Sequence, residues 1–328
     1  MPSKTGPAQP VFQRVNAYIK KSPARMAVII SILLYGFTVA MVPTALNISA
    51  ITSIVMLTLL LSFASAGQTI VLIGGGLDFT VGAVMSASAI LTTGIMNSQN
   101  GRFAPAFVAV TAMGAAVGLI NGLCTVKIGL PALIVTLAIS NVISRLQYVL
   151  TEGSPLGYAA PNFIKTVTSK FFNVIPSLSL YGLVIIPLAL YVLNRSRYGK
   201  QLYLVGNNPE AARLSGVKVN RVKILSYVLS GMFAGFAGML GAGYMQSAKC
   251  QMFDNYAYNS LIAVIIGGTA FTGGVGAYSG SIAGALLMVV LNNALTALNL
   301  AQPVRNIFLG FVLALLLVAY NRKKPVRQ

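Results

Sequence analysis

The chain has 328 residues, of which 56% are hydrophobic and only 8% are charged, and its mean hydropathy is +0.79. Soluble domains carry about 25% charged residues, so the composition excludes a soluble globular protein and predicts a polytopic membrane protein. Lys and Arg outnumber Asp and Glu by 23 to 4. Scattered basic residues in an apolar, glycine-rich chain fit membrane orientation better than nucleic-acid binding. We therefore expect contact with a lipid bilayer and none with nucleic acid.

Ten apolar runs are candidates to cross the ~30 Å hydrocarbon core of a bilayer. The eighth run is short, so we expect it to be tilted, broken or re-entrant. The pattern predicts an all-α, polytopic transmembrane fold of about ten spans, near residues 26–46, 50–73, 79–97, 105–126, 131–150, 178–194, 224–247, 257–271, 279–298 and 303–320.

The basic residues predict the orientation of the chain. They gather before the first span, within residues 195–223 and after the last span. Since cytoplasmic loops are enriched in Lys and Arg, we expect both termini in the cytoplasm. The predicted organisation is an uncleaved basic tail at 1–25, one transmembrane domain at 26–320 that includes a cytoplasmic loop at 195–223, and a basic tail at 321–328.

Catalysis by the chain itself is not expected. It has no His, only four acidic residues, no metal-ligand cluster and no GxxxxGK[ST] phosphate loop. We therefore predict no catalytic residue, no metal site and no cofactor of its own.

One acidic residue is expected within the membrane domain, in the stretch VLIGGGLDFTVG between the second and third spans. Two roles for Asp78 are open: it caps the N-terminus of the third span, or it takes part in gating. The glycines allow tight backbone geometry around it. The candidate gating or cap motif is Gly74, Gly75, Gly76, Asp78 and Gly82.

Other glycines recur at the four-residue spacing that lets helix backbones approach closely. We expect packing seams, not binding sites, at Gly114, Gly118 and Gly122, at Gly231 and Gly235, and at Gly276, Gly280 and Gly284. A second glycine-rich stretch, VIIGGTAFTGGVG at residues 264–276, resembles the first with a one-residue gap. It indicates either an internal repeat or merely the high glycine content of membrane helices.

The fifth span carries a polar stripe. Helical spacing places Thr136, Ser140, Ser144 and Gln147 on one face, with Asn141, Arg145 and Tyr148 beside it. The functional interpretation is a hydrophilic wall of a translocation path for a neutral polar solute, to which Thr136, Ser140, Asn141, Ser144, Gln147 and Tyr148 contribute. The alternative is hydrogen bonding between helices.

A polar segment with its own short helix, residues 198–217, lies between two long apolar runs. Asn208 is a good N-cap, Pro209 suits the first helical position, and Glu210 complements the helix N-terminus. The helix continues through Ala211, Ala212 and Arg213, and Gly216 closes it. We interpret this segment as a docking element; the alternative is an ordinary structured loop.

Three motifs resemble the membrane permeases of bacterial ATP-binding-cassette importers in the ribose and monosaccharide family. They are GGGLDFTVG from Gly74; YGKQLYLVGNNPEAARLSGV from Tyr198, with the following KILSYVLSGMFAGFAG; and SLIAVIIGGTAFTGGVGAYSGSIAGALL from Ser260. With LNNAL at 291–295, the resemblance covers most of the chain from Asn47 onward.

The resemblance implies a type II importer fold in a bacterial inner membrane. It implies these partners: ABC ATPase subunits that use ATP and Mg, a second permease subunit, and a periplasmic solute-binding protein that delivers a small polar solute, expected to be a sugar. The family's coupling helix carries over onto residues 208–216, and its path-lining helix onto residues 131–150.

The chain departs from the family where relatives often have an acidic ELDAIAAV pattern, because it reads Ala257, Tyr258, Asn259 and Ser260 there. Two other functions stay open. One is a branched-chain amino-acid permease of the related importers, and the other is a self-sufficient secondary carrier or channel.

Overall fold

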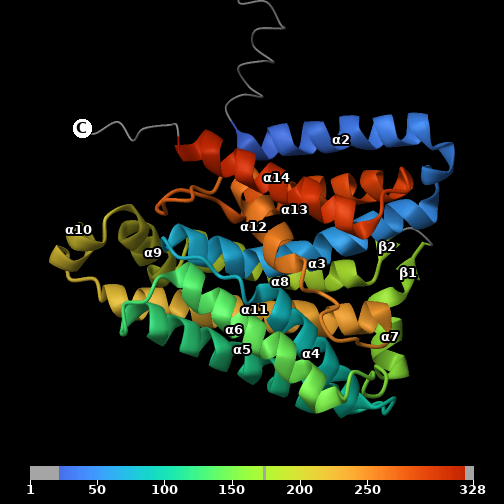
Figure 1. The fold of residues 1–328 in the computed structure, drawn as a ribbon, viewed down its shortest axis with the longest axis horizontal. Helices are drawn as coiled ribbons and strands as arrows, with labels where there is room; N and C mark the ends of the chain where they lie inside the picture. Colours follow the sequence, from blue (N-terminus) through green and yellow to red (C-terminus); the bar gives the residue numbers. More distant parts are fainter. Residues whose placement is uncertain (1–21, 173–174, 322–328) are drawn as a thin grey trace, which may run out of the picture.

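The computed structural model describes residues 22–172 and 175–321, which form a bundle of helices (Figure 1). The helices are α2 (Pro23–Met41), α3 (Ile48–Ile73), α4 (Val81–Met96), α5 (Phe103–Val126), α6 (Ala132–Thr151), α7 (Pro161–Thr168), α8 (Leu178–Asn194), α9 (Arg197–Asn207), α10 (Pro209–Leu214), α11 (Val219–Met245), α12 (Tyr256–Ile266), α13 (Tyr278–Ala297) and α14 (Gln302–Asn321), with a 3-10 turn at Pro43–Ala45. The predicted helical fold is confirmed. The sequence did not predict the short antiparallel pair of β1 (Lys170–Phe171) and β2 (Ile175–Pro176).

Each expected span coincides with a helix, but the count of ten spans is not confirmed. Within the described part of the chain, six helices are long and apolar enough to cross a membrane: α2, α3, α5, α6, α11 and α13. Helices α8 and α9 pass that test only as a pair, bent by 59° at the break between them. Helix α12, the expected short eighth span, has 11 residues and reaches about 16 Å, half of the hydrocarbon core.

Helix α11 lies at the centre of the packing, against α3, α4 and α5. A Cβ atom added to Gly231 would lie 1.9 Å from the carbonyl oxygen of Gly114, and one added to Gly118 would lie 2.1 Å from that of Tyr227. No side chain fits at such distances, so the backbones of α5 and α11 touch directly. The predicted seams at Gly114–Gly122 and Gly231–Gly235 are confirmed.

The third glycine series is confirmed only in part. Cβ atoms added to Gly280 and Gly284 on α13 would lie 2.0 and 1.9 Å from carbonyl oxygens of Gly267 and Ala263. Including Gly276 is wrong, because this residue precedes α13 and faces the side chain of Thr269 instead of a helix backbone.

The two glycine-rich stretches end their helices in the same way. After α3, Gly75 has φ +76°, and the N–H of Gly76 donates to Val71 O at 2.9 Å. After α12, Gly268 has φ +93°, and the N–H of Thr269 donates to Val264 O at 3.1 Å. Glycine adopts such a positive φ without strain, which explains the second glycine of the pair in each stretch.

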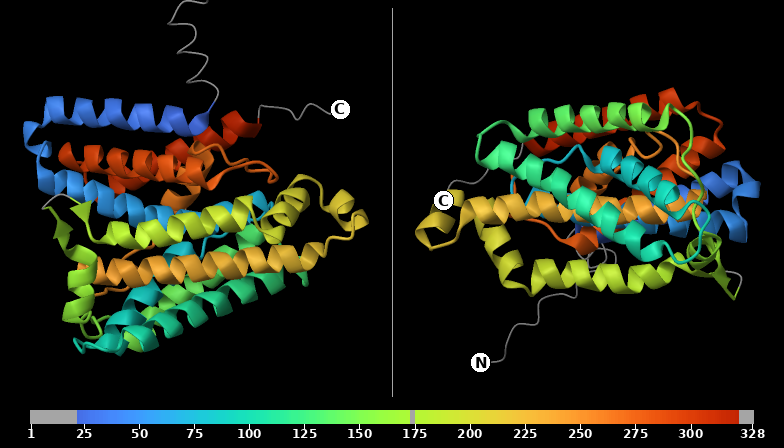
Figure 2. Two further views of the ribbon diagram at one scale, coloured as in Figure 1. Left: turned by 180° about the vertical axis from the view of Figure 1, so that it is seen from behind. Right: turned by 90° about the horizontal axis from the view of Figure 1, so that it is seen from below.

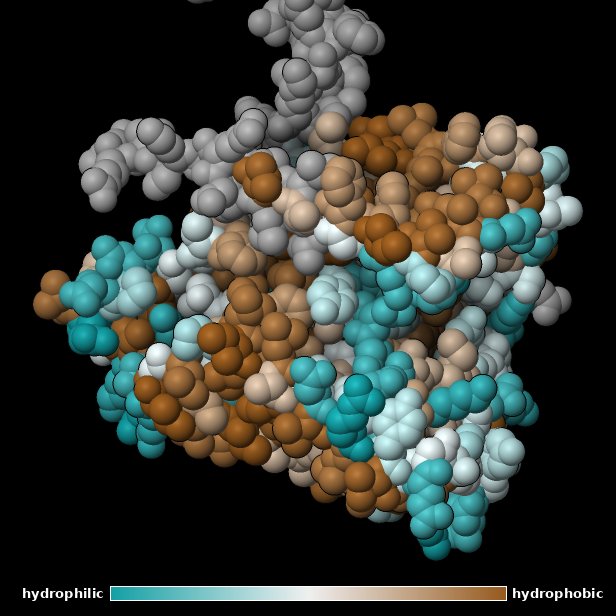
Figure 3. Space-filling model, viewed as in Figure 1, coloured by the Kyte–Doolittle hydropathy of each residue, from teal (hydrophilic) through white to brown (hydrophobic). Residues whose placement is uncertain are grey.

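The bundle has two distinct ends (Figures 1 and 2). Helix α10 projects from one end, and α7 with the β1–β2 pair caps the other. The N-terminal end of α2 and the C-terminal end of α14 lie on the side of α10. Between the two ends, large parts of the surface are hydrophobic (Figure 3), as expected for contact with lipid.

The seam between α5 and α11 generates a stability prediction. Gly231→Val should destabilise the protein, because the new side chain cannot fit against Gly114 O without separating the helices, and overpacking of this kind costs about 1–3 kcal/mol or more. The matched control is Gly36→Val on α2, where an added Cβ meets nothing within 4 Å.

The chain has no Trp, so unfolding is best followed with a thiol-reactive dye that reports exposure of Cys124 and Cys250. The unfolding midpoint should fall for Gly231→Val and stay near the parental value for Gly36→Val. Equal midpoints for the two variants would contradict direct backbone contact.

Candidate functional site

The segment between α11 and α12, residues 246–255, turns back into the bundle between α4 and α6. Helix α11 ends at Gln246, whose φ of +68° reverses the chain. Gly82 on α4 makes the approach possible, because a Cβ there would lie 2.5 Å from Asp254 O. The requirement for glycine at this position of the GGGLDFTVG motif therefore comes from a residue far away in the sequence.

Asp254 joins three elements at this place. One carboxylate oxygen accepts from the Ser86 hydroxyl on α4 at 3.2 Å, and the other accepts from the Ser144 hydroxyl on α6 at 3.3 Å. The Arg145 guanidinium forms no close ion pair with the carboxylate, but its positive charge acts on it at longer range. Sequence reasoning considered only Asp78 as an acid within the membrane domain and missed Asp254.

Gln147 holds the same segment through the backbone. Its amide nitrogen donates to Ala83 O at 3.1 Å, and its amide oxygen accepts from the N–H of Gln251 at 2.9 Å. The Tyr148 hydroxyl donates to the side-chain oxygen of Gln251 at 3.2 Å. Backbone groups buried in a membrane protein must find partners inside the protein, and Gln147 supplies two of them.

The structure divides the predicted polar stripe into two groups. Thr136, Ser144 and Gln147 are buried, whereas Ser140 is half-buried and Asn141 and Tyr148 are exposed. Hydrogen bonding between elements therefore accounts for Ser144 and Gln147. The Thr136 hydroxyl donates to Ala132 O of its own helix. That the stripe lines a translocation path stays a prediction, supported by the exposed side chains.

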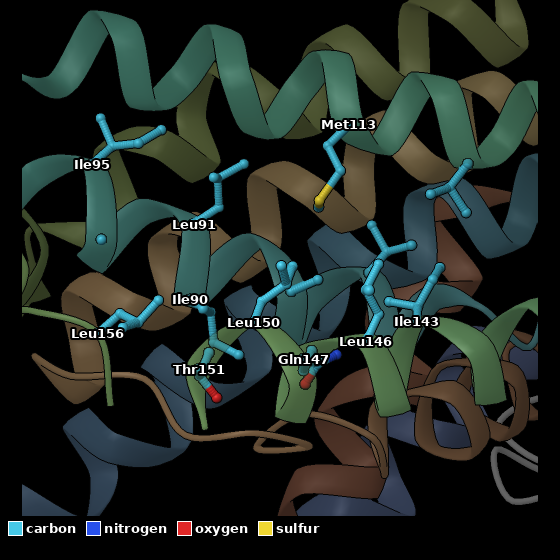
Figure 4. Close-up of a pocket in the computed structure, with 14 residues that line it drawn as sticks. Ile90, Leu91, Ile95, Met113, Ile143, Leu146, Gln147, Leu150, Thr151 and Leu156 are labelled. Atoms are coloured by element: carbon cyan, nitrogen blue, oxygen red, sulfur yellow. The ribbon is translucent and has the colours of Figure 1, made fainter. Parts of the chain in front are cut away.

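A separate cavity of 320 Å³ lies between α4, α5 and α6 (Figure 4). Its walls are almost wholly aliphatic, and Figure 4 shows side chains such as Leu91, Met113 and Ile143 directed into it. It has two polar residues. Both side-chain amide atoms of Gln147 are hydrogen-bonded to backbone groups, and the Thr151 hydroxyl is hydrogen-bonded to the Cys250 sulfur. The cavity offers a polar solute no hydrogen-bond partner and suits hydrocarbon instead.

Asp78 lies in the turn between α3 and α4 and is 1% exposed. Its carboxylate accepts from the N–H of Thr80 at 2.9 Å and also from the Thr80 hydroxyl. Asn121 on α5 in turn donates to that hydroxyl at 2.9 Å. The N-cap interpretation is wrong by two residues, because Thr80 precedes the helix and Asp78 closes the turn before it. A gating role stays a prediction.

The predicted short helix is confirmed as α10. Asn208 is its N-cap and accepts from the N–H groups of Glu210 and Ala211 at 3.0 and 3.1 Å. Gly216 follows the helix with φ +79°, and its N–H donates to Arg213 O at 3.0 Å. Pro209 occupies the first turn and Ala212 is buried.

Helix α10 is connected to both glycine-rich turns through α9. Gly206, near the end of α9, lies so close to Ile73 O that an added Cβ would be 1.8 Å from it. The same oxygen accepts from the N–H of Gly274 at 2.9 Å, and the Tyr203 hydroxyl donates to Gly276 O at 2.8 Å. A displacement of α9 therefore acts on both turns at once.

Leu214 at the tip of α10 is 91% exposed. Sequence reasoning passed over this residue in naming the functional positions of the helix. It belongs to the exposed surface of the helix together with Glu210 and Arg213. Leu214 is the one bulky aliphatic residue within PEAARL, and this was the feature of the sequence that could have singled it out.

Among residues 22–172 and 175–321, no group of three or more His, Cys, Asp or Glu side chains lies together as a metal site requires.

Comparison with known proteins identifies the family. Residues 50–318 match the model of the branched-chain amino acid transport system / permease component family. The chain is 30% identical over 315 residues to the galactose/methyl galactoside import permease protein MglC of Haemophilus influenzae, covering 89% of this chain and 94% of that protein. No solved structure matches it significantly.

Two further relatives are also named for sugars. The ribose import permease protein RbsC of Escherichia coli K12 is 29% identical over 286 residues, covering 86% of this chain and 88% of that protein. The fructose import permease protein FrcC of Rhizobium meliloti is 30% identical over 292 residues, covering 86% and 81%.

The contacts of Gln147 generate a second prediction. Gln147→Leu leaves the part-buried N–H of Gln251 without a partner, at a cost of about 1–3 kcal/mol, and also removes the bond to Ala83 O. The segment of residues 246–255 should then separate from α4 and α6 more often. In a Cys124→Ser background, alkylation of Cys250 should become faster by about tenfold or more.

The control is Asn141→Leu on the same helix, because Asn141 is exposed and makes no hydrogen bond among the described residues. Its alkylation rate should match that of the parent. If Gln147→Leu also reacts at the parental rate, Gln147 does not hold the segment.

Proposed function

The chain belongs to the branched-chain amino acid transport system / permease component family, and on that premise we propose that it is the transmembrane permease subunit of an ATP-driven monosaccharide importer. The observation that carries the proposal is the set of relatives named for galactose, ribose and fructose, each aligned over most of both chains. The proposed protein is a multi-pass subunit of a bacterial inner membrane and not an enzyme.

The competing functions have less support. The family description contains the words branched-chain amino acid, but the three relatives described above are named for the import of sugars. Helix α10 is capped, exposes Leu214 and projects away from the bundle. A self-sufficient carrier has no partner that such a helix could contact.

The proposed partners are ABC ATPase subunits, a second permease subunit and a periplasmic binding protein. ATP and Mg would be used by the ATPase, because this chain has no phosphate loop. Helix α10 is the proposed coupling helix: its exposed face carries Glu210, Arg213 and Leu214, which can bind a groove of the ATPase.

The proposed orientation places α10 and both termini in the cytoplasm. The N-terminal end of α2 and the C-terminal end of α14 lie on the same side of the bundle as α10, which supports this (Figure 1), as does the concentration of basic residues in the sequence of the two tails and the 195–223 loop. The proposal retains ten membrane segments, in which α4 and α12 enter the bilayer as shorter helices backed by protein.

The proposed function predicts the energy source of transport. The importer, reconstituted in liposomes with its ATPase and binding protein, should accumulate radiolabelled ribose, galactose or fructose with ATP and without any ion gradient. Uptake by this chain alone, driven by a pH step, would contradict the proposal and support a secondary carrier.

The N-cap of α10 generates a further prediction. Asn208→Ala removes the acceptor of two N–H groups and costs about 0.5–2 kcal/mol of local helix stability. Because a frayed helix transmits force poorly, binding-protein-stimulated ATP hydrolysis should fall or become uncoupled from uptake. Insertion should be unaffected, since α10 lies outside the membrane segments.

Asn208→Ser is the matched control, because serine is an equally good N-cap. It should restore coupled transport. If the alanine variant transports at the parental rate, α10 is an ordinary structured loop.

A further inference from the structure

We propose that Asp254, Arg145 and Gln251, beside the ring of Tyr148, form a subsite that binds neighbouring hydroxyl groups of the transported sugar. This inference rests on the proposed function and names the residues that recognise its substrate class. The four side chains come from α6 and from the segment between α11 and α12.

The carboxylate of Asp254 has unused capacity to accept hydrogen bonds. A carboxylate offers about four acceptor positions, and the described partners are Ser86 and Ser144 at the long distances of 3.2 and 3.3 Å. Ser86 has a single hydroxyl hydrogen, and Gly82 O competes for it at 3.0 Å. Asp254 is only half-buried, so a ligand can reach the free positions.

Donor groups lie next to this acceptor. Arg145 is exposed, interacts electrostatically with Asp254 and makes no hydrogen bond among the described residues. The backbone N–H of Gln251 donates to Gln147, and its side-chain oxygen accepts from Tyr148. Its side-chain nitrogen has no partner in the described part of the chain. These bonds hold the amide in place while its donor hydrogens remain available.

Tyr148 adds an apolar surface. Its side chain is 41% exposed, and the hydrogen bond from its hydroxyl to Gln251 fixes the position of the ring. An aromatic ring held in this way can pack against the C–H groups of a sugar while the polar side chains bind its hydroxyls.

The opposite charges of Asp254 and Arg145 favour a solute without net charge over an ion. Asp254 would repel an anion and Arg145 would repel a cation, whereas a hydroxyl group both donates and accepts. A pair of adjacent hydroxyls can donate to the carboxylate and accept from the guanidinium or the amide. Figure 3 shows hydrophilic surface interrupting the hydrophobic surface on this face of the molecule.

The subsite is suited to transient binding of a passing solute and not to tight binding. Few contacts on an open surface give weak binding, and a translocation path needs binding weak enough for release. The structure thus locates recognition of the sugar within the permease itself, in addition to the binding protein.

The test is uptake by the complete importer in liposomes, with parental protein, Asp254→Asn and Arg145→Gln. The probes are the sugar that the parent transports, chosen from ribose, galactose and fructose, and its singly deoxygenated analogues. Loss of a hydrogen bond to a charged group should lower uptake of the full sugar by about tenfold in Asp254→Asn. For at least one analogue the effect should shrink to about twofold, because the hydroxyl that binds Asp254 is already missing.

The matched control is Glu152→Gln, since Glu152 follows α6, is exposed and makes no hydrogen bond among the described residues. It should transport like the parent. Arg145→Gln changes only an exposed side chain and should also alter discrimination among the analogues. If Asp254→Asn does not assemble, the uptake of the analogues by Arg145→Gln tests the subsite by itself.

Equal losses for the full sugar and every analogue, or parental uptake by both variants, would overturn the subsite. A parental complex without ATP-dependent uptake would instead overturn the proposed function, so the two failures are distinguishable.

Discussion

Direct contact between helix backbones on α11 is the constraint on which the rest of the structure depends. Glycines along this helix face carbonyl groups of α5 and α4: Gly231 faces Gly114 O, and a Cβ on Gly238 would lie 2.2 Å from Met85 O. Lipid gives helices no hydrophobic reason to associate, so close packing of small residues has to supply the attraction. Because α11 holds α4 and α5 at this distance, it also defines the space into which residues 246–255 turn back.

Breaks in the helices are possible because side chains inside the bundle satisfy the backbone there. The turn before α4 is closed by Asp78 and supported by Asn121, while the return before α12 is held by Gln147 and Ser86. In a bilayer an unpaired N–H or C=O group costs several kcal/mol. The polar residues of the interior are therefore explained first by the chain's own backbone. Side chains that are exposed or half-buried, such as Arg145, Tyr148 and Asp254, remain accessible to a solute.

The two glycine-rich turns connect the projecting end of the molecule to its interior. Gly206 on α9 touches Ile73 at the end of α3, and Gly274 bonds to the same carbonyl. One turn leads into α4, which carries Ser86, and the other follows α12, which begins just after Asp254. Motion of α10 can thus reach α4 and α12, which lie next to the proposed subsite, through the contacts of α9 with the two turns.

Sequence patterns alone determined the helical fold, the approximate position of each apolar helix that was expected as a span, and the caps of α10. Such features depend on local hydropathy and on the conformational preferences of single residues such as Asn208, Pro209 and Gly216. Both are set by residues close together in the sequence. The resemblance in its motifs led to the family that the comparisons then identified. The polar stripe was also visible, as side chains on one face of a helix.

Only the tertiary structure decided which of those side chains are used for packing. Ser144 and Gln147 are bound by residues more than a hundred positions away, and no periodicity along the chain reveals such partners. Asp254 escaped notice for the same reason: it stands outside every apolar run, and its place between α4 and α6 exists only because Gly82 allows the chain to return there. Helical periodicity is a property of one segment, whereas a site built from three segments depends on how closely their backbones can approach.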